Sequence, residues 1–196
     1  MCEQAREAEM DPRTTALIVI DVQQGFINAH SAGAVPVIVR MVEAWKSAGA
    51  PVVFARFQNL PNSPYEKISG WTRLRTPEEQ AIVAELQPHI GDAAAVVDKG
   101  TSSVFANGAG RALAEAGWTD LVFVGIDTDS CVYDSAIDAY HSGFRPWIAV
   151  DACASSGGDE YHSAALLLAR RNIGSAQLIT SHDAIARLTS TERAYS

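Results

Sequence analysis

The chain has 196 residues, of which 47% are hydrophobic and 19% are charged, so it can close one core without a disulfide or a structural metal. Fifteen Lys and Arg against 23 Asp and Glu give a net charge of −8, and the basic residues form no stripe or tail. This composition excludes the electrostatic footprint that nucleic-acid or anionic-lipid binding requires. We therefore expect neither a nucleic-acid partner nor a membrane partner.

The N-terminus and the cysteines indicate the setting in which the protein works. Residues 1–13 are charged and lack the apolar stretch of a signal peptide, and no other segment approaches about 18 consecutive apolar residues. The three cysteines, Cys2, Cys131 and Cys153, show no CxxC spacing, which favours neither a disulfide framework nor a zinc site. We expect a flexible N-terminus over 1–13, a single domain over 14–190 and a cytoplasmic location.

Strand and helix patterns alternate along the chain. The first apolar run, TALIVI at 15–20, is short and does not alternate with polar residues, which is typical of a strand buried on both faces. In chain order, the sequence predicts strands at 15–20, 52–57, 95–98, 121–125, 147–151 and 176–180, with helices at 36–48, 77–86, 108–116, 131–141 and 160–171. This alternation predicts a three-layer α/β/α domain with a six-stranded, mostly parallel sheet.

The connection over 58–76 is longer than a typical loop between a strand and a helix. Long ordered loops at strand ends commonly contribute to binding sites. In open parallel sheets, ligands bind outside the carboxyl ends of the strands. The strand ends and this loop are therefore the places where we expect functional residues.

Cys131 is the first candidate for a chemical role. It follows the predicted strand 121–125 and the polar stretch 127–130, and lies in the first turn of a predicted helix. Exposed backbone N–H groups and the positive end of the helix dipole favour a thiolate at such a position. The alternative is a small buried hydrophobic residue, which is the commoner role of a free cysteine. Position alone leaves both interpretations open.

Two charged residues end other strands of the same predicted sheet. Lys99 could hold a thiolate or relay a proton, although alone it would be interpreted as a solvated cation. Asp21 could accept the thiol proton as a general base, although alone it would be interpreted as a helix cap or a loop residue. Because parallel strand ends converge at one sheet edge, the combination with Cys131 is more specific than any single member.

Three segments carry a resemblance to a known family: IDVQQGF at 20–26, KGTSSVF at 99–105 and GIDTDSCV at 125–132. With them the chain resembles the isochorismatase-like cysteine hydrolase superfamily, which includes nicotinamidases and N-carbamoylsarcosine amidases. The resemblance implies a Rossmann-like fold, a homodimer or homotetramer, and a catalytic triad of Asp21, Lys99 and Cys131. It also implies a cis peptide at Ile126–Asp127 and an oxyanion hole formed by the backbone N–H groups of Asp127 and Cys131.

Two departures from the family narrow the expected chemistry. Nicotinamidases share an Asp-x-His pair and a further His after the second strand, which bind a metal, whereas this chain reads ARFQNLPNS at 55–63. We therefore expect no metal and no cofactor. Isochorismatases proper, which cleave a vinyl ether, commonly lack the cysteine. The presence of Cys131 therefore favours hydrolysis of a carbon–nitrogen bond.

Six side chains are candidates for a substrate pocket. They are Phe26, Arg56, Asn59, Trp71, Phe105 and Tyr133. The aromatic ones could wall an apolar pocket, although aromatic residues at such places are as often ordinary core. Arg56 and Asn59 could bind a polar group of the substrate, or they could belong to a solvated loop.

The sequence as a whole predicts a metal-independent cysteine amidohydrolase. Its substrate would be a small amide or ureido compound, and its intermediate would be a thioester. One alternative is a vinyl-ether hydrolase of the isochorismatase kind. Another is a catalytically silent, ligand-binding member of the same fold, because a fold alone does not determine a function.

Overall fold

The structure is a computed structural model that describes residues 9–106 and 109–190. Its centre is a sheet of six strands in the order β3-β2-β1-β4-β5-β6, and every neighbouring pair is parallel. The strands are β1 (Thr15–Ile20), β2 (Val52–Phe57), β3 (Ala95–Lys99), β4 (Asp120–Ile126), β5 (Arg145–Ala154) and β6 (Leu178–Ile179). The predicted fold class is confirmed, and the sheet is parallel throughout.

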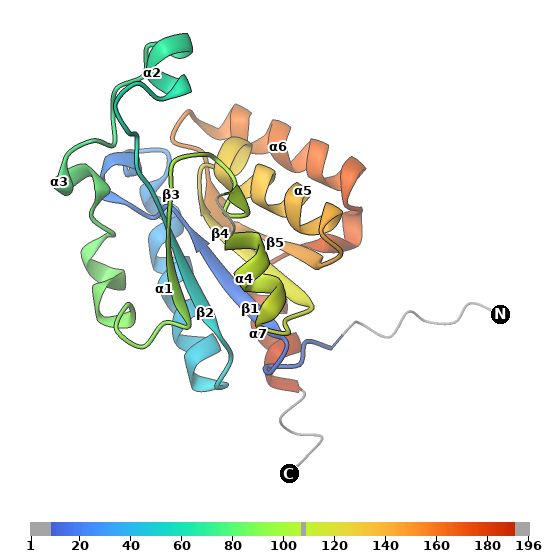
Figure 1. The fold of residues 1–196 in the computed structure, drawn as a ribbon. Coiled ribbons are helices and arrows are strands. Elements are labelled where there is room, and N and C mark those ends of the chain that lie inside the picture. The colour runs from blue at the N-terminus through green and yellow to red at the C-terminus, as the bar shows by residue number, and fades with distance from the viewer. Residues whose placement is uncertain (1–8, 107–108, 191–196) are drawn as a thin grey trace.

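Helices cover both faces of the sheet (Figure 1). They are α1 (Val35–Ser47), α2 (Pro64–Ser69), α3 (Pro77–Gln80), α4 (Ala109–Glu115), α5 (Tyr133–His141), α6 (Asp159–Asn172) and α7 (Ser181–Ser190). The buried side chains of α1 and α7 pack on one face, and those of α4, α5 and α6 pack on the other. Within the described ranges, no helix has both the length and the apolar character needed to cross a membrane.

The segment at 77–86 differs from the single helix that its sequence predicts. It contains the short helix α3, whose first turn is closed by a capping box between Thr76 and Glu79, and a 3₁₀ turn at Ala84–His89. Between them, the Val83 N–H donates to the Val22 carbonyl (3.1 Å) and the Ala81 carbonyl accepts from Gln24 (2.8 Å). These contacts with the chain after β1 replace helical hydrogen bonds, so tertiary structure overrides the local pattern.

The C-terminal part of the domain also differs from the prediction. The strand predicted at 176–180 is reduced to β6, because residues Ser175–Gln177 form a 3₁₀ turn. Helix α7, which the sequence analysis did not identify, follows directly. Its side chains Ala184 and Leu188 are one turn apart and fully buried against the α1 face of the sheet.

The order of the strands reverses between β1 and β4, which places a crevice at their carboxyl ends. At this point the two strands approach each other closely at Gly125, whose φ is +126°. A Cβ at this position would lie 2.0 Å from the Ile20 carbonyl oxygen, so no larger residue fits. Gly125 therefore allows the segments that follow β1 and β4 to lie side by side.

The N-terminal segment that we expected to be flexible is described only in part. Residues 1–8 lie outside the described residues. Met10, in contrast, is 1% exposed, and its N–H donates to the carbonyl of Arg187 in α7 (3.3 Å). The packed domain therefore already includes Met10.

Candidate active site

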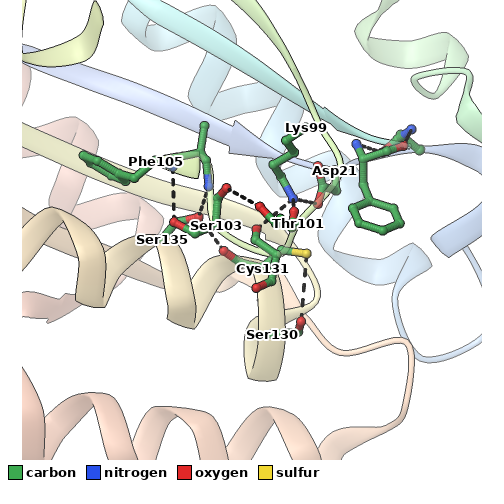
Figure 2. Close-up of polar contacts among 12 residues, drawn as sticks. Asp21, Lys99, Thr101, Ser103, Phe105, Ser130, Cys131 and Ser135 are labelled. Carbon is green, nitrogen blue, oxygen red and sulfur yellow. Dashed lines mark hydrogen bonds and ion pairs between the residues drawn. The ribbon is translucent and has the colours of Figure 1, made fainter. Parts of the chain in front are cut away.

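Asp21, Lys99 and Cys131 meet at the carboxyl edge of the sheet (Figure 2). Asp21 follows β1, Lys99 ends β3, and Cys131 lies in the turn after β4. The Lys99 Nζ donates to the Asp21 Oδ2 at 2.6 Å, and the two side chains are 1% and 0% exposed. To reach Asp21 from two strands away, the Lys99 ammonium passes over the ring of Phe57, 5.3 Å from its centroid. The predicted convergence of the three residues is therefore present.

The Lys99 ammonium has an acceptor for each of its three N–H bonds. Besides Asp21, it donates to the carbonyls of Thr101 (3.0 Å) and Ser102 (2.8 Å), because the chain after β3 folds back over it. Lys99 therefore fixes the position of the Asp21 carboxylate and is shielded from the solvent. The other oxygen of that carboxylate, Oδ1, is buried and has no hydrogen-bond partner in the described part of the chain.

The turn that carries Cys131 is held at several points. It is a π-helical turn over Thr128–Val132 that leads directly into α5. The Ser135 Oγ donates to the Cys131 carbonyl (2.6 Å) and accepts from the Val104 N–H (3.0 Å), which ties the turn to the segment after β3. The Asp127 carboxylate accepts from the N–H (2.5 Å) and Oγ (3.0 Å) of Ser156. The cis peptide implied at Ile126–Asp127 is present.

Burial controls the protonation of this cluster. Burial raises the pKa of the Cys131 thiol well above its usual range, and the negative charge of Asp21 raises it further. Burial also raises the pKa of Asp21, although the Lys99 charge opposes this effect. Burial alone would lower the pKa of Lys99, but the negative charge of Asp21 raises it overall. This direction of the Cys131 pKa favours a neutral resting thiol, whereas its position near a helix start favours a thiolate.

A cavity of about 390 Å³ opens onto Cys131. Its lining residues are Phe26, Phe57, Tyr65, Ser69, Trp71, Asp127, Ser130 and Cys131. Of the six predicted pocket residues, the structure thus places Phe26 and Trp71 at the cavity. The sequence analysis did not identify Phe57, Tyr65, Ser69 or Ser130. Two of these four residues have a signal in the sequence: Phe57 ends a predicted strand, and Tyr65 lies in the long loop over 58–76.

Arg56 and Asn59 do not reach this cavity. The Arg56 guanidinium forms a two-point ion pair with Asp98 on β3, with Nε–Oδ1 at 2.7 Å and Nη2–Oδ2 at 2.8 Å. Side chains alternate along a strand, so Arg56 faces away from its neighbour Phe57. Asn59 is buried, and its Nδ2 donates to the carbonyls of Trp71 and Arg73 (3.0 Å each). Asn59 therefore shapes the loop, and the expectation that it contacts the substrate is corrected.

Phe105 and Tyr133 pack against the core on the α5 side of the sheet and do not line the cavity. The Phe105 ring packs edge-on against Phe144 (5.7 Å between centroids) and points away from the Cys131 sulfur in Figure 2. Tyr133 packs against the same cluster, and its hydroxyl accepts from Asn172 Nδ2 (2.5 Å). Both are partly buried aromatic residues packed against the core, which is close to the alternative that the sequence left open.

No metal-binding cluster is found in the part of the chain that the structure describes. Within residues 9–106 and 109–190, no three His, Cys, Asp or Glu side chains gather in an arrangement that could hold a metal ion. The segment after β2, where the resemblance would place such ligands, carries Gln58 and Asn59. These residues do not fit the ligand set of a metal-dependent relative.

Comparisons with known proteins identify the family of the chain. The model of the isochorismatase domain matches residues 15–183. Ureidoacrylate amidohydrolase RutB of Methylobacterium radiotolerans is 32% identical over 193 residues, covering 80% of this chain and 73% of the relative. Nicotinamidase 3 of Arabidopsis thaliana is 25% identical over 172 residues, covering 84% of each chain.

Solved structures show the same fold. Nicotinamidase PncA of Bacillus subtilis superposes with a TM-score of 0.76 at 28% identity, covering 85% of this chain and 99% of that one. N-carbamoylsarcosine amidase of Thermoplasma acidophilum gives a TM-score of 0.74 at 24% identity, covering 88% and 97%. The sequence resemblance, the fold and the matched domain lead to one conclusion: the chain belongs to the isochorismatase family.

Proposed function

We propose that the protein is a cysteine amidohydrolase that cleaves a carbon–nitrogen bond of a small amide or ureido compound through a thioester. One observation carries the proposal. A buried Lys99–Asp21 pair presents an unpartnered carboxylate oxygen beside a neutral cysteine that lines a cavity. A neutral thiol needs a base at the moment of attack, and Asp21 is placed to be that base.

In the first half of the reaction, the Cys131 thiol gives its proton to the Asp21 Oδ1 as the sulfur attacks the substrate carbonyl carbon. The carbonyl π electrons move to the oxygen, where a negative charge develops. The N–H groups of Asp127 and Cys131 donate hydrogen bonds to this oxygen. The Asp127 N–H is available for this role, because it has no acceptor among the described residues.

In the second half, the carbon–nitrogen bond breaks and the leaving nitrogen takes the proton from Asp21. The product acyl group stays on Cys131 as a thioester, and a water molecule attacks it while Asp21 again accepts a proton. Collapse of this second intermediate returns the proton to the sulfur and releases the acid. Lys99 remains charged throughout and keeps the Asp21 carboxylate in place.

The relatives support the reaction class. Both ureidoacrylate amidohydrolase and nicotinamidase are named for hydrolysis of non-peptide carbon–nitrogen bonds. We extend this class, and not their substrates, to the present chain. A cytoplasmic location and a homodimeric or homotetrameric state stay predictions.

A screen of small amides and ureides for ammonia release, with two cysteine variants, tests the proposal. Cys131→Ala should lower the rate by a factor on the order of 10³ or more, while unfolding free energy changes by only about 1–2 kcal/mol. Cys153→Ala is the matched control, because burial raises the pKa of that thiol to about 12 and its Sγ lies 3.7 Å from the Phe123 carbonyl. Mass spectrometry should detect an acyl adduct on Cys131 only.

Full activity in Cys131→Ala would refute the cysteine mechanism. The same pair of variants separates it from vinyl-ether hydrolysis, for which isochorismate is the probe and pyruvate is the product. Pyruvate release that survives in Cys131→Ala but not in Asp21→Asn would assign that alternative reaction.

A further inference from the structure

The wall of the catalytic cavity is a continuous set of aromatic rings. Phe26 and Trp71 are nearly parallel, with centroids 6.2 Å apart and planes at 19°. Phe57 contacts both Trp71 (5.7 Å) and Tyr65 (5.2 Å), and Tyr65 packs edge-on against Trp71 (5.8 Å). Aromatic faces of this kind favour flat, apolar or aromatic ligands. The cavity volume of about 390 Å³ suits a molecule with a single ring.

The long loop holds this wall in a defined position. The Trp71 N–H donates to the Tyr65 carbonyl (2.9 Å), and the Trp71 carbonyl accepts from the Asn59 amide (3.0 Å). The Ser63 hydroxyl donates to the other end of the Asn59 amide at 2.6 Å. The aromatic surface is therefore built before a ligand arrives.

No cationic side chain lines the cavity among the described residues. Three cationic residues of the surrounding segments have other partners. Lys99 is buried with three acceptors, Arg56 is paired with Asp98, and Arg73 donates to the Gly25 carbonyl at 2.6 Å. Within residues 9–106 and 109–190, the only acidic side chain in the lining is that of Asp127. A substrate carboxylate would lose its hydration here and gain no opposite charge.

From these observations we infer that the substrate is an uncharged amide whose acyl group is aromatic or similarly flat and apolar. The ring lies against Trp71 and Phe26, and the amide carbonyl reaches Cys131. The inference rests on the proposed amidohydrolase function and specifies its substrate class. It separates this chain from the relatives named for ureidoacrylate, because that compound carries a carboxylate.

Two probes of nearly equal shape test the inference. 4-Nitrobenzamide is uncharged, whereas 4-carbamoylbenzoate has a carboxylate in place of the nitro group. We expect kcat/KM for ammonia release from the uncharged probe to be higher by about tenfold or more, as for other mismatched polar groups. Acetamide, which has no ring, should be hydrolysed at least about tenfold less efficiently than 4-nitrobenzamide, because it lacks the aromatic contacts.

A variant pair tests the cause of the discrimination. Ser69→Arg adds a cation to the cavity lining and should raise kcat/KM for 4-carbamoylbenzoate relative to 4-nitrobenzamide. Ile68→Arg is the matched control, since Ile68 is 86% exposed and lies outside that lining. The control adds the same charge one residue away and should leave the ratio unchanged.

Two results would overturn the inference. One is a wild-type enzyme that hydrolyses the carboxylate probe as well as the nitro probe. The other is an enzyme that releases ammonia from ureidoacrylate but from no uncharged aromatic amide. If either activity disappears in Cys131→Ala, the proposed function survives and only the substrate class is wrong. If the activity does not depend on Cys131, the proposed function fails as well.

Discussion

Replacing Lys99 by methionine measures what the buried ion pair contributes. The two side chains are 1% and 0% exposed and 2.6 Å apart, so the substitution leaves the Asp21 carboxylate buried without its cation. Removal of one partner from a buried pair destabilises a protein by about 3–5 kcal/mol. We expect a loss of this size in the free energy of unfolding at pH 7, together with a loss of activity.

The loss should depend on pH in a defined direction. Burial already raises the pKa of Asp21, and the Lys99 charge is the largest effect that opposes it. Without Lys99 the pKa of folded Asp21 rises further above its unfolded value. The folded variant then binds a proton that the unfolded chain has lost, so its stability increases as the pH falls. The deficit relative to the wild type should therefore shrink between pH 7 and pH 5.

Urea unfolding of four proteins provides the measurement: the wild type, Lys99→Met, Asp21→Asn and the double variant. Because the double variant contains neither charge, it should be more stable than the sum of the single effects, by about 1–3 kcal/mol. Lys46→Met is the control, because Lys46 pairs with Asp92 at the surface, where the carboxylate is 68% exposed. That change should cost no more than about 1 kcal/mol.

A loss below about 1 kcal/mol in Lys99→Met, unchanged from pH 5 to pH 8, would refute the reasoning, because it would mean that Asp21 does not need the cation. Strict additivity in the double variant would also contradict it. In either case Lys99 would act only as a donor to the carbonyls of Thr101 and Ser102.

Two further predictions concern the frame of the site. Gly125→Ala should lower the free energy of unfolding in urea by more than about 3 kcal/mol, since its Cβ would meet the Ile20 carbonyl. Gly49→Ala is the control: Gly49 has φ +66° and open space around it, so the change should cost only about 1–2 kcal/mol. Thr128 Oγ1 lies 2.8 Å from His162 Nδ1, and burial lowers the pKa of His162. The unfolded chain therefore binds a proton at the His162 imidazole more readily than the folded chain does. The free energy of unfolding should fall as the pH drops below about 6.5, and it should fall less steeply in His162→Gln. Equal pH slopes in the two proteins would contradict the lowered pKa.

The sheet could be predicted from the sequence because its central strands are buried on both faces. The strands β1 and β4 are buried along their whole length, and all but their first residues form short apolar runs or glycine, which is typical of central parallel strands. The order of strands and the reversal between β1 and β4 are properties of the whole chain. The conformation of residues 77–86 also depends on distant parts of the chain, because hydrogen bonds with Val22 and Gln24 determine it. Local patterns contain no information about such partners.

The candidate catalytic residues could be predicted because each of them lies at, or shortly after, the carboxyl end of a strand. The side-chain directions that form the pocket could not. Arg56 and Phe57 are neighbours in β2, yet one faces Asp98 and the other faces the cavity, because successive side chains point to opposite faces. Asn59 is in the right loop but is used to hold Trp71. Proximity to a site along the sequence therefore does not determine which groups a substrate meets.

The charge of the resting site relates the proposed chemistry to the aromatic cavity. With Lys99 and Asp21 paired and the proton on the Cys131 thiol, as the raised pKa of that thiol favours, the three side chains together have no net charge. Transfer of the thiol proton to Asp21 moves one negative charge from oxygen to sulfur, and attack moves it on to the substrate oxygen. One negative charge thus remains near the fixed Lys99 ammonium at every step. Separated charges are costly where water is excluded. A buried ammonium that keeps its proton and its position therefore suits this series of reaction steps. The same low polarity favours an uncharged substrate, since a second anion in the cavity would oppose the charge that the reaction develops.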